Sequence, residues 1–370
     1  MKYLSKTNPR QFKGKTVLLR VDLNIENTRD EASLFRLDAV IPTIEYLLKA
    51  GARVVLMSHR GRPQAAHRNK SFRDFSLGAF ALILAKRLCH DIEFIAAYRV
   101  GAIRKTLKKT NTRAILLENL RFFAGEEKND PAFAKALATL GDYYVNDAFA
   151  VSHRRNASVV AITKFLPSFV GLQLEKEIFN LNKIKEIAKK PFTLIVGGAK
   201  TSDKVGVLEY FSKRADWILL GGGPANTFFK AAGLPIGNSV YDPKILTLAL
   251  RMLRNENVVL PADSREKGGK ILDIGPYTAE KFSKIIKSSK MVLWSGPLGE
   301  FEKKQFSKGS EKIARAIISS KAISIVGGGE TVTLLAKLKL LNKIKFVSTG
   351  GGAMLDYLAG KKLPGIEALK

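Results

Sequence analysis

Cysteine is almost missing from this 370-residue chain, and long apolar runs are missing altogether. Because Cys89 is the one cysteine in the sequence, an intrachain disulfide and a zinc site built on several cysteines are both excluded. This scarcity agrees with a reducing compartment. No uncharged run approaches the ~18 apolar residues that span a bilayer. Residues 1–10 have no apolar segment of the secretory type. We therefore expect a soluble, cytoplasmic protein.

Acidic residues are the second deficit. There are 33 Asp and Glu against 62 Lys and Arg, a formal net charge of +29. This charge attracts polyanions, so nucleic acid, anionic lipid and phosphorylated metabolites all stay open as partner classes. The excess is +14 up to Lys164 and +15 beyond, which excludes a basic tail. Arginine is uneven, since 16 of 21 lie before residue 165. For the charge as a whole, we favour a solvated, lysine-rich surface over a specific partner.

Short β-branched apolar runs recur along the chain. They are continuous rather than alternating, which is typical of strands buried on both faces of a parallel sheet. The segments between them predict helices, such as 38–50 and 130–140. The pattern predicts an α/β fold with doubly wound parallel sheets. The ten expected strands are 16–21, 53–57, 114–117, 143–145, 193–196, 217–220, 257–260, 291–294, 322–326 and 345–348.

The chain is predicted to divide into two lobes, as its length also indicates. Residues 165–171 contain proline and glycine, and the charged amphipathic segment 174–187 after them predicts a helix that joins the lobes. The expected organisation is a first lobe over 1–166, a joining segment over 167–187 and a second lobe over 188–352.

The predicted strands of the first lobe end in cationic and polar residues. The carboxyl ends of parallel strands form one sheet edge, where ligands bind, so we expect these side chains to converge. A single arginine at a strand end is usually a surface residue in an ion pair. Several at successive strand ends favour a basic, concave site for a small ligand with several negative charges. The cations are Arg20, His59, Arg62, Arg121, His153 and Arg154, with Asp22 and Asn24 available for hydroxyl groups.

The predicted strands of the second lobe end in glycine clusters. Glycine lets a ligand approach the backbone, and amides at a helix N-terminus favour phosphate. One triplet is weak evidence, but four clusters after buried strands predict a nucleotide phosphate site, without a Walker loop. Lys200 and Lys204, four residues apart, are expected on one face of a helical turn. Solvated lysines are the alternative. The clusters are residues 197–198, 221–223, 327–329 and 350–352.

Six strings of this sequence resemble those of the phosphoglycerate kinase family, in the family's order and across essentially the whole chain. The resemblance implies two Rossmann-like lobes joined by a helix, with a C-terminal segment, 353–370, that returns to the first lobe. It also implies glycolytic phosphoryl transfer from 1,3-bisphosphoglycerate to ADP, direct and in line, as the lobes close and exclude water. The strings are Arg20-Val21-Asp22-Leu23-Asn24, Ser58-His59-Arg60-Gly61-Arg62-Pro63, Glu118-Asn119-Leu120-Arg121-Phe122, Gly197-Gly198-Ala199-Lys200 with Ser202-Asp203-Lys204, Gly296-Pro297, and Ser348-Thr349-Gly350-Gly351-Gly352-Ala353.

The resemblance further implies roles for single residues, with 3-phosphoglycerate on the first lobe and MgADP or MgATP on the second. Arg36 would act at the transition state together with Lys200, the amides of Gly350, Gly351 and Gly352, and Mg²⁺. The phosphoglycerate contacts would be Asp22, Asn24, Arg36, His59, Arg62, Arg121 and Arg154. The nucleotide contacts would be Gly198, Gly222, Gly223, Leu272, Pro297 and Glu302 around adenine and ribose, and Lys200, Lys204, Gly327, Gly328, Gly329 and Thr331 at the phosphates.

Several positions depart from the family's pattern. Glu330 stands where the family has an aspartate for the metal nucleotide, and the extra methylene matters because Mg²⁺ is strict about distance. Ser295 replaces an asparagine, Asn156 replaces a second histidine, and Glu300 occupies a usually apolar place near adenine. The segment after Asp263 is shorter than usual, as for a trimmed surface hairpin. Since the catalytic charges are kept, we predict activity with altered metal or nucleotide affinity.

Two other classes of function stay open. The first is a kinase-like protein that binds nucleotide or a polyanion with weakened or no catalysis, an idea motivated by residues 295, 300 and 330. The second is nucleic-acid binding driven by the net charge, although no signature of a nucleic-acid module appears. We favour the enzyme, and expect a monomer with small-molecule substrates, no specific nucleic acid and no membrane partner.

Overall fold

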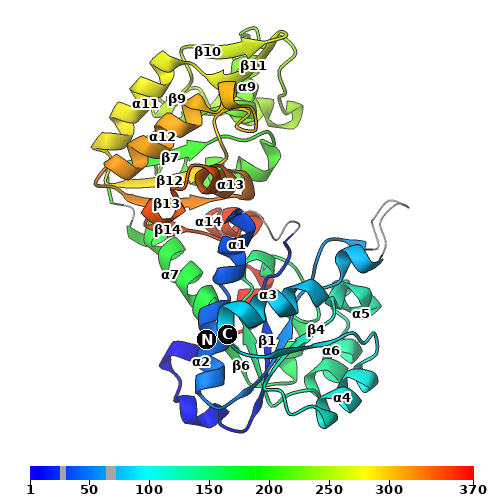
Figure 1. The fold of residues 1–370 in the computed structure, drawn as a ribbon. Coiled ribbons are helices and arrows are strands. Elements are labelled where there is room, and N and C mark those ends of the chain that lie inside the picture. The colour runs from blue at the N-terminus through cyan, green and yellow to red at the C-terminus, as the bar shows by residue number, and fades with distance from the viewer. Residues whose placement is uncertain (26–30, 64–71, 188) are drawn as a thin grey trace. The chain divides into compact units, whose positions relative to one another are not determined.

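Two six-stranded parallel sheets form the cores of the structure, a computed structural model that describes residues 1–25, 31–63, 72–187 and 189–370. The chain divides into two units (Figure 1). Unit 1 comprises Met1–Phe179 and Lys362–Lys370, and unit 2 comprises Asn180–Lys361. Helices flank both sheets (Figure 1). The predicted α/β class with two parallel sheets is confirmed.

The sheet of unit 1 has the order β3-β4-β2-β1-β5-β6, and each neighbouring pair is parallel. Arg20, the last residue of β1, pairs with Met57 at the end of β2 and with Asn146 at the end of β5. The loops after these three strands therefore begin at one sheet edge. The strands are β1 (Thr16–Arg20), β2 (Arg53–Met57), β3 (Ile92–Ile95), β4 (Ala114–Leu117), β5 (Tyr143–Asn146) and β6 (Ser168–Val170).

Side chains cap the start of two of the helices of unit 1, α6 and α7. The Asp130 carboxylate accepts from the Ala132 amide, with Pro131 as the first residue of α6. The Asp147 carboxylate accepts from the amides of Gln173 and Leu174 at the start of α7, as a cap from a distant part of the sequence. The helices are α1 (Glu31–Asp38), α2 (Ile41–Lys49), α3 (Gly78–Leu88), α4 (Val100–Lys109), α5 (Ala124–Glu127), α6 (Pro131–Ala138), α7 (Leu172–Ile187) and α15 (Pro364–Glu367). Because the unit boundary follows Phe179, α7 belongs to both units.

The sheet of unit 2 has the order β14-β13-β12-β7-β8-β9, again with parallel neighbours. Its central strands β7 and β12 are buried at every residue, which explains their continuous apolar sequence. An antiparallel hairpin of β10 and β11 forms where the trimmed hairpin was expected. The strands are β7 (Phe192–Val196), β8 (Trp217–Leu220), β9 (Val258–Val259), β10 (Ser264–Lys267), β11 (Lys270–Ile274), β12 (Met291–Ser295), β13 (Ile323–Gly327) and β14 (Phe346–Val347).

The helices of unit 2 pack partly on one another. Helices α11 and α12 lie side by side (Figure 1), and α9 contacts α10. They are α8 (Val205–Phe211), α9 (Gly222–Ala231), α10 (Leu246–Met252), α11 (Pro276–Ser288), α12 (Lys308–Ser319), α13 (Gly329–Lys337) and α14 (Gly352–Leu358).

The C-terminal segment joins unit 1 later than residue 353, where the return was expected. Helix α14 packs on α8 within unit 2, and the Tyr357 hydroxyl donates to Asn182 over 2.6 Å. The return begins at Lys362. There the Gly365 amide donates to the Ser152 carbonyl over 2.8 Å.

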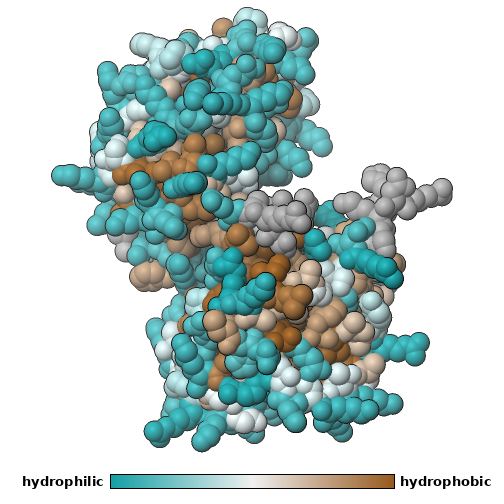
Figure 2. All heavy atoms as spheres, viewed as in Figure 1, coloured by the Kyte–Doolittle hydropathy of each residue, from teal (hydrophilic) through white to brown (hydrophobic). Residues whose placement is uncertain are grey.

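The surface agrees with the composition. Hydrophilic side chains cover much of the visible face of each unit (Figure 2). Within the described part of the chain, no helix combines the length and apolarity needed to cross a membrane.

Candidate active site

Arg20 is the centre of a buried polar cluster in unit 1. It is 1% exposed at the end of β1. Its Nε donates to the Ser158 hydroxyl over 2.9 Å and its Nη1 to the Val21 carbonyl over 2.5 Å. Its Nη2 lies 3.1 Å from Nδ1 of His59. Because a guanidinium only donates, His59 accepts at Nδ1 and carries its hydrogen on Nε2.

His59 is neutral, contrary to its expected place among the cations. Burial lowers its pKa well below 6.5, and the positive charges of Arg20, Arg121, Arg154 and Arg36 lower it further. An uncharged imidazole can still donate one hydrogen bond from Nε2 to an anionic ligand.

Arg36 of α1 faces the loop after β1. Its guanidinium pairs with the Asp22 carboxylate through Nη2, and Nη1 donates to the Asn24 carbonyl over 3.3 Å. The Asn24 side chain accepts from the Gly61 amide over 2.8 Å, so it links the loops after β1 and β2. The buried Nε of Arg36 has no acceptor among the described residues. Among the described residues, one donor of this arginine is therefore unused.

The remaining cations surround the same sheet edge. Arg121, in η5 (Leu120–Phe122), is 3% exposed, and its Nε lies 3.2 Å from the Glu127 carboxylate. Burial lowers its pKa to about 10; Glu127 opposes this shift, and Arg154, Arg20 and Arg62 add to it. Burial also lowers the pKa of Arg154, with Arg62 contributing.

These mutual shifts follow from the closeness of five of the predicted cations, which the structure brings together: Arg20, His59, Arg62, Arg121 and Arg154. Arg62 is exposed, and Nε of Arg154 donates to Nε2 of His153 over 3.3 Å. Clustered like charges raise the free energy of the folded protein unless an anion accompanies them. The arrangement therefore favours an anionic ligand.

The glycine-rich turns of unit 2 contact one another through their backbones. The Gly198 amide donates to the Pro297 carbonyl over 2.6 Å, and the Gly223 amide to the Gly198 carbonyl over 2.9 Å. The Gly222 amide donates to Leu298 over 3.1 Å. A Cβ on Gly197 would lie 2.1 Å from the Pro297 carbonyl oxygen. These amides are paired inside the protein, so the expectation of free amides at the first two clusters is wrong. Glycine is needed there for close packing.

The later clusters differ. A Cβ at Gly329, Gly351 or Gly352 would meet no atom within 4 Å. Gly329 and Gly352 begin α13 and α14, where the first amides have no acceptor inside the helix. The fully buried Thr331 accepts from the Gly296 amide over 2.7 Å, so its hydroxyl holds a turn.

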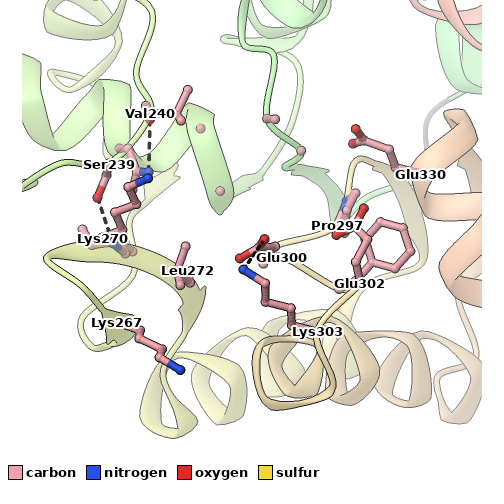
Figure 3. Close-up of a pocket in the computed structure, with 18 of the residues that line it drawn as sticks. Ser239, Val240, Lys267, Lys270, Leu272, Pro297, Glu300, Glu302, Lys303 and Glu330 are labelled. Carbon is pink, nitrogen blue, oxygen red and sulfur yellow. Dashed lines mark hydrogen bonds and ion pairs between the residues drawn. The ribbon is translucent and has the colours of Figure 1, made fainter.

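A cavity of about 560 Å³ opens in unit 2 (Figure 3). Leu272 and Glu300 are neighbours in its lining (Figure 3), because the Glu300 amide donates to the Leu272 carbonyl over 2.8 Å, and the Glu300 carboxylate pairs with Lys303 at 2.9 Å. The volume is in the range of small-molecule sites. The predicted residues that line it are Gly198, Gly222, Gly223, Leu272, Pro297, Glu302 and Glu330; residues that the sequence did not single out include Ser239, Val240, Lys267, Lys270 and Ile271.

Lys200 and Lys204 behave differently from each other. Lys204 ends η8 (Ser202–Lys204), is 8% exposed, and donates from Nζ to the Lys200 carbonyl over 3.0 Å. Burial lowers its pKa, while Glu330 opposes the shift. A Cβ on Gly198 would lie 2.9 Å from Glu330 Oε2 and 3.3 Å from Lys204 Nζ, so the ends of both side chains lie close to Gly198. Lys200 is exposed, and neither lysine lines the cavity.

Comparison with known proteins decides the family. A family model described as phosphoglycerate kinase matches residues 7–361. The chain belongs to the phosphoglycerate kinase family.

Its relatives cover nearly the whole chain. The phosphoglycerate kinase of Akkermansia muciniphila is 42% identical over 96% of this chain and 95% of its own length. That of Finegoldia magna is 40% identical over 96% of both. The solved phosphoglycerate kinases of Coxiella burnetii and Pyrococcus horikoshii superpose with TM-scores of 0.82 and 0.86 at 34% and 31% identity. They cover 99% and 100% of this chain and 98% of each of theirs. The chain is thus a phosphotransferase, and a purely binding role is not favoured.

Among the residues that the structure describes, this member of the phosphoglycerate kinase family has no metal site built from protein groups alone. The described residues contain no group of three or more His, Cys, Asp or Glu side chains that could hold an ion. Glu330 is a single carboxylate at the cavity. One carboxylate suits Mg²⁺ that arrives on nucleotide phosphates, since Mg²⁺ usually keeps phosphate and water ligands.

Sequence reasoning missed three residues of unit 1. Glu127 pairs with Arg121, and Glu126 and Ser158 form buried hydrogen bonds beneath Arg20. A search for cations at strand ends passes over acids and hydroxyls. The available signal was the pair of adjacent acids Glu126 and Glu127 shortly after Arg121, because carboxylates close to an arginine are natural partners for it.

Proposed function

We propose that this kinase transfers a phosphoryl group reversibly between 1,3-bisphosphoglycerate and ADP, giving 3-phosphoglycerate and ATP, a step of glycolysis. The observation that carries the proposal is the pairing of two unlike sites in one chain. Unit 1 gathers guanidinium groups at one sheet edge, and unit 2 has a nucleotide-sized cavity beside glycine-rich turns. The family assignment agrees with this division of labour.

On the phosphoglycerate side, several donors would share the anionic charges of the substrate. Asn24 and neutral His59 would supply uncharged hydrogen bonds, and Asp22 would orient Arg36. Arg36, with one donor unused among the described residues, would stabilise the equatorial oxygens of the transferring phosphoryl group. The remaining contacts proposed there are Arg20, Arg62, Arg121, His153 and Arg154.

On the nucleotide side, the cavity would take the base and ribose. Leu272 supplies an apolar wall, and Glu302 a carboxylate for ribose hydroxyls. Gly198, Gly222, Gly223 and Pro297 complete this part. Lys200, Lys204 and the backbone of residues 327–329, with Thr331, would face the phosphates. The amides of Gly350, Gly351 and Gly352 would act with Lys200 at the transition state.

Magnesium belongs to the proposal as a part of the nucleotide substrate. When bound, it neutralises phosphate charge. Glu330 is the residue that would hold it, and the chain's own residues do the rest by placing the two substrates in line. No protein nucleophile is needed. We also propose that the units close on their substrates during turnover, which excludes water from the acyl phosphate.

A coupled assay of ATP formation from 1,3-bisphosphoglycerate and MgADP tests the proposal. We expect turnover that depends on ADP, with a reaction lacking ADP as the control for hydrolysis. A folded protein that binds MgADP but forms no ATP would overturn the proposal in favour of a nucleotide-binding protein.

A monomer in the cytoplasm is the state we propose for this enzyme. The monomer follows the family analogy, and the single cysteine supports a reducing compartment. Light scattering during gel filtration measures the first; a mass near twice 40.7 kDa would contradict it.

A further inference from the structure

Four buried polar residues of unit 1 are linked in series by hydrogen bonds beside the cationic site, and we call this series the relay. Glu126, Ser158 and Arg20 are each 1% exposed, and His59 is 2% exposed. The Ser158 hydroxyl lies 2.6 Å from Glu126 Oε1 and 2.9 Å from Arg20 Nε. Arg20 Nη2 lies 3.1 Å from His59 Nδ1.

The direction of every side-chain hydrogen bond in the relay is fixed. A guanidinium only donates and a carboxylate only accepts. The Ser158 hydroxyl must therefore donate to Glu126 and accept from Arg20, and His59 must accept at Nδ1. Reversal of one bond would leave a buried polar group unpaired, which costs about 1–3 kcal/mol.

Glu126 also holds the loop that carries His153 and Arg154. Its Oε2 accepts from the Ser158 amide over 3.0 Å, and its backbone carbonyl accepts from the Ala157 amide over 2.9 Å. A single buried carboxylate thus ties the loop after β5 to Arg20 on β1. It supplies a negative charge to a buried guanidinium that has no direct carboxylate partner among the described residues.

We propose that Glu126, acting through Ser158, is a positioning residue for the phosphoglycerate site. It orients Arg20, and Arg20 in turn holds His59 in the form with Nδ1 free of hydrogen and Nε2–H available to the substrate. The assignment of substrate rests on the proposed function, whereas the relay itself is a property of the free protein.

The relay is tested first without substrate, by NMR of protein labelled with ¹⁵N-histidine. The chain has only four histidines, and the His59 signals are identified by their loss in His59→Gln. We expect an unprotonated Nδ1 in the wild type. Ser158→Ala and Glu126→Gln should both shift the His59 ring signals.

Tyr144→Phe is the matched control. Its hydroxyl donates to the Ser158 backbone carbonyl over 2.7 Å, and its side chain is fully buried. The substitution removes a buried hydrogen bond to the same residue but leaves the relay of side chains intact. The His59 signals should stay in place.

Kinetics then test the positioning role. Loss of one buried hydrogen bond should raise KM for 3-phosphoglycerate about tenfold in Ser158→Ala and Glu126→Gln. KM for ATP should change no more than in Tyr144→Phe. Equal rises of both KM values would make the relay a merely structural contact and overturn the proposal.

The outcomes separate the relay from the proposed function. A protonated Nδ1 in the wild type would overturn the relay even if no variant folded. His59 signals unmoved in Ser158→Ala would do the same. A wild-type protein without turnover would overturn the proposed function and, with it, the substrate role of Glu126, while the NMR result would still decide the relay.

Discussion

The two units share one architecture and place opposite kinds of residue at their strand ends. In unit 1, long side chains such as Arg20 and Arg121 stand at the sheet edge and are nearly fully buried. In unit 2, the corresponding turns are glycines that approach one another backbone to backbone, and a cavity of about 560 Å³ lies beside them. The same sheet edge can thus be filled with charge or hollowed for a ligand.

This difference has an energetic side. Burial lowers the pKa of Arg121 in unit 1 to about 10, and the neighbouring guanidinium groups add to this shift. The charge is partly offset by acids, Glu127 directly and Glu126 through Ser158. In unit 2, backbone hydrogen bonds hold the glycine-rich turns together. Among the described residues of this unit, only one buried lysine, Lys204, has a lowered pKa. Unit 1 should therefore respond to changes of side-chain charge, and unit 2 to changes of side-chain volume.

The largest expected effect concerns the cationic site of unit 1. Arg36→Met removes the guanidinium proposed to act at the transition state, and kcat should fall about 10³-fold. Steady-state kinetics with both substrates saturating measure it. Arg87→Met is the control, because Arg87 is also 31% exposed and also pairs with an aspartate, Asp38. Equal losses in the two variants would contradict the role of Arg36.

Buried carboxylates allow a comparison of both units by pH. Burial raises the pKa of Asp147 in unit 1 from 3.8 to about 6, and that of Asp273 in unit 2 to about 7. A raised pKa means that the folded state holds the proton more tightly. The stabilisation is complete below about pH 4 and is lost as pH rises through the folded-state pKa. For Asp147 the shift corresponds to about 3 kcal/mol.

Asp147→Asn should therefore flatten the fall in unfolding free energy between pH 4 and 6, and Asp273→Asn the fall that continues to pH 7. Denaturant titrations at a series of pH values measure both. Subtracting each variant's pH curve from that of the wild type separates the contribution of that one carboxyl from the opposite contributions of acids whose pKa is lowered. A wild-type slope retained in full by Asp147→Asn would show that this carboxyl has an ordinary pKa.

A volume change tests the glycine turns of unit 2. Gly222 has a φ of +55°, and a Cβ there would lie 2.8 Å from the Gly198 carbonyl oxygen. Gly222→Ala should lower the unfolding free energy by about 2 kcal/mol. Gly329→Ala, with open space around its Cβ, should leave stability unchanged and instead weaken nucleotide binding. Equal destabilisation of the two would refute close packing as the reason for glycine at 222.

The smallest expected effect concerns the metal nucleotide. Glu330→Asp shortens the side chain whose carboxylate lies close to Gly198, and it should tighten MgADP binding by about tenfold or less. Calorimetry with MgADP measures this, with metal-free ADP as the control ligand. Unchanged or weaker MgADP binding would count against the metal role of Glu330.

Much of the fold could be predicted because buried parallel strands have continuous apolar sequences. The two strands missed in the parallel sheets, β3 and β6, lie at the edges of the sheet of unit 1. The first is only partly buried at three of four residues and the second has three residues, so neither has a long apolar run. Burial at a sheet edge depends on neighbours that are distant in sequence.

The site was predictable by residue type but not by state. The strand-end rule found Arg20, Arg121 and His59. It could not show that His59 is neutral, because its pKa depends on burial and on four surrounding arginines. Nor could spacing show that the Gly198 and Gly223 amides are already paired, since their acceptors come from other turns. The adjacent acids Glu126 and Glu127 are a signal of partners for arginine, but spacing does not show which of their side chains points inward, and Ser158 carries no local signal at all.

The late return of the chain to unit 1 has a consequence for biosynthesis. Residues 362–370, which include the buried Leu363, Ile366 and Leu369, complete unit 1 only after the whole of unit 2 has been made. At roughly 5–20 residues per second, the intervening stretch of about 180 residues occupies the ribosome for about 10–40 s. During that interval the nascent first unit lacks its final apolar contacts. Because unit 2 is contiguous in sequence and its last residue precedes residues 362–370, all of its residues are synthesised before those of unit 1 are complete.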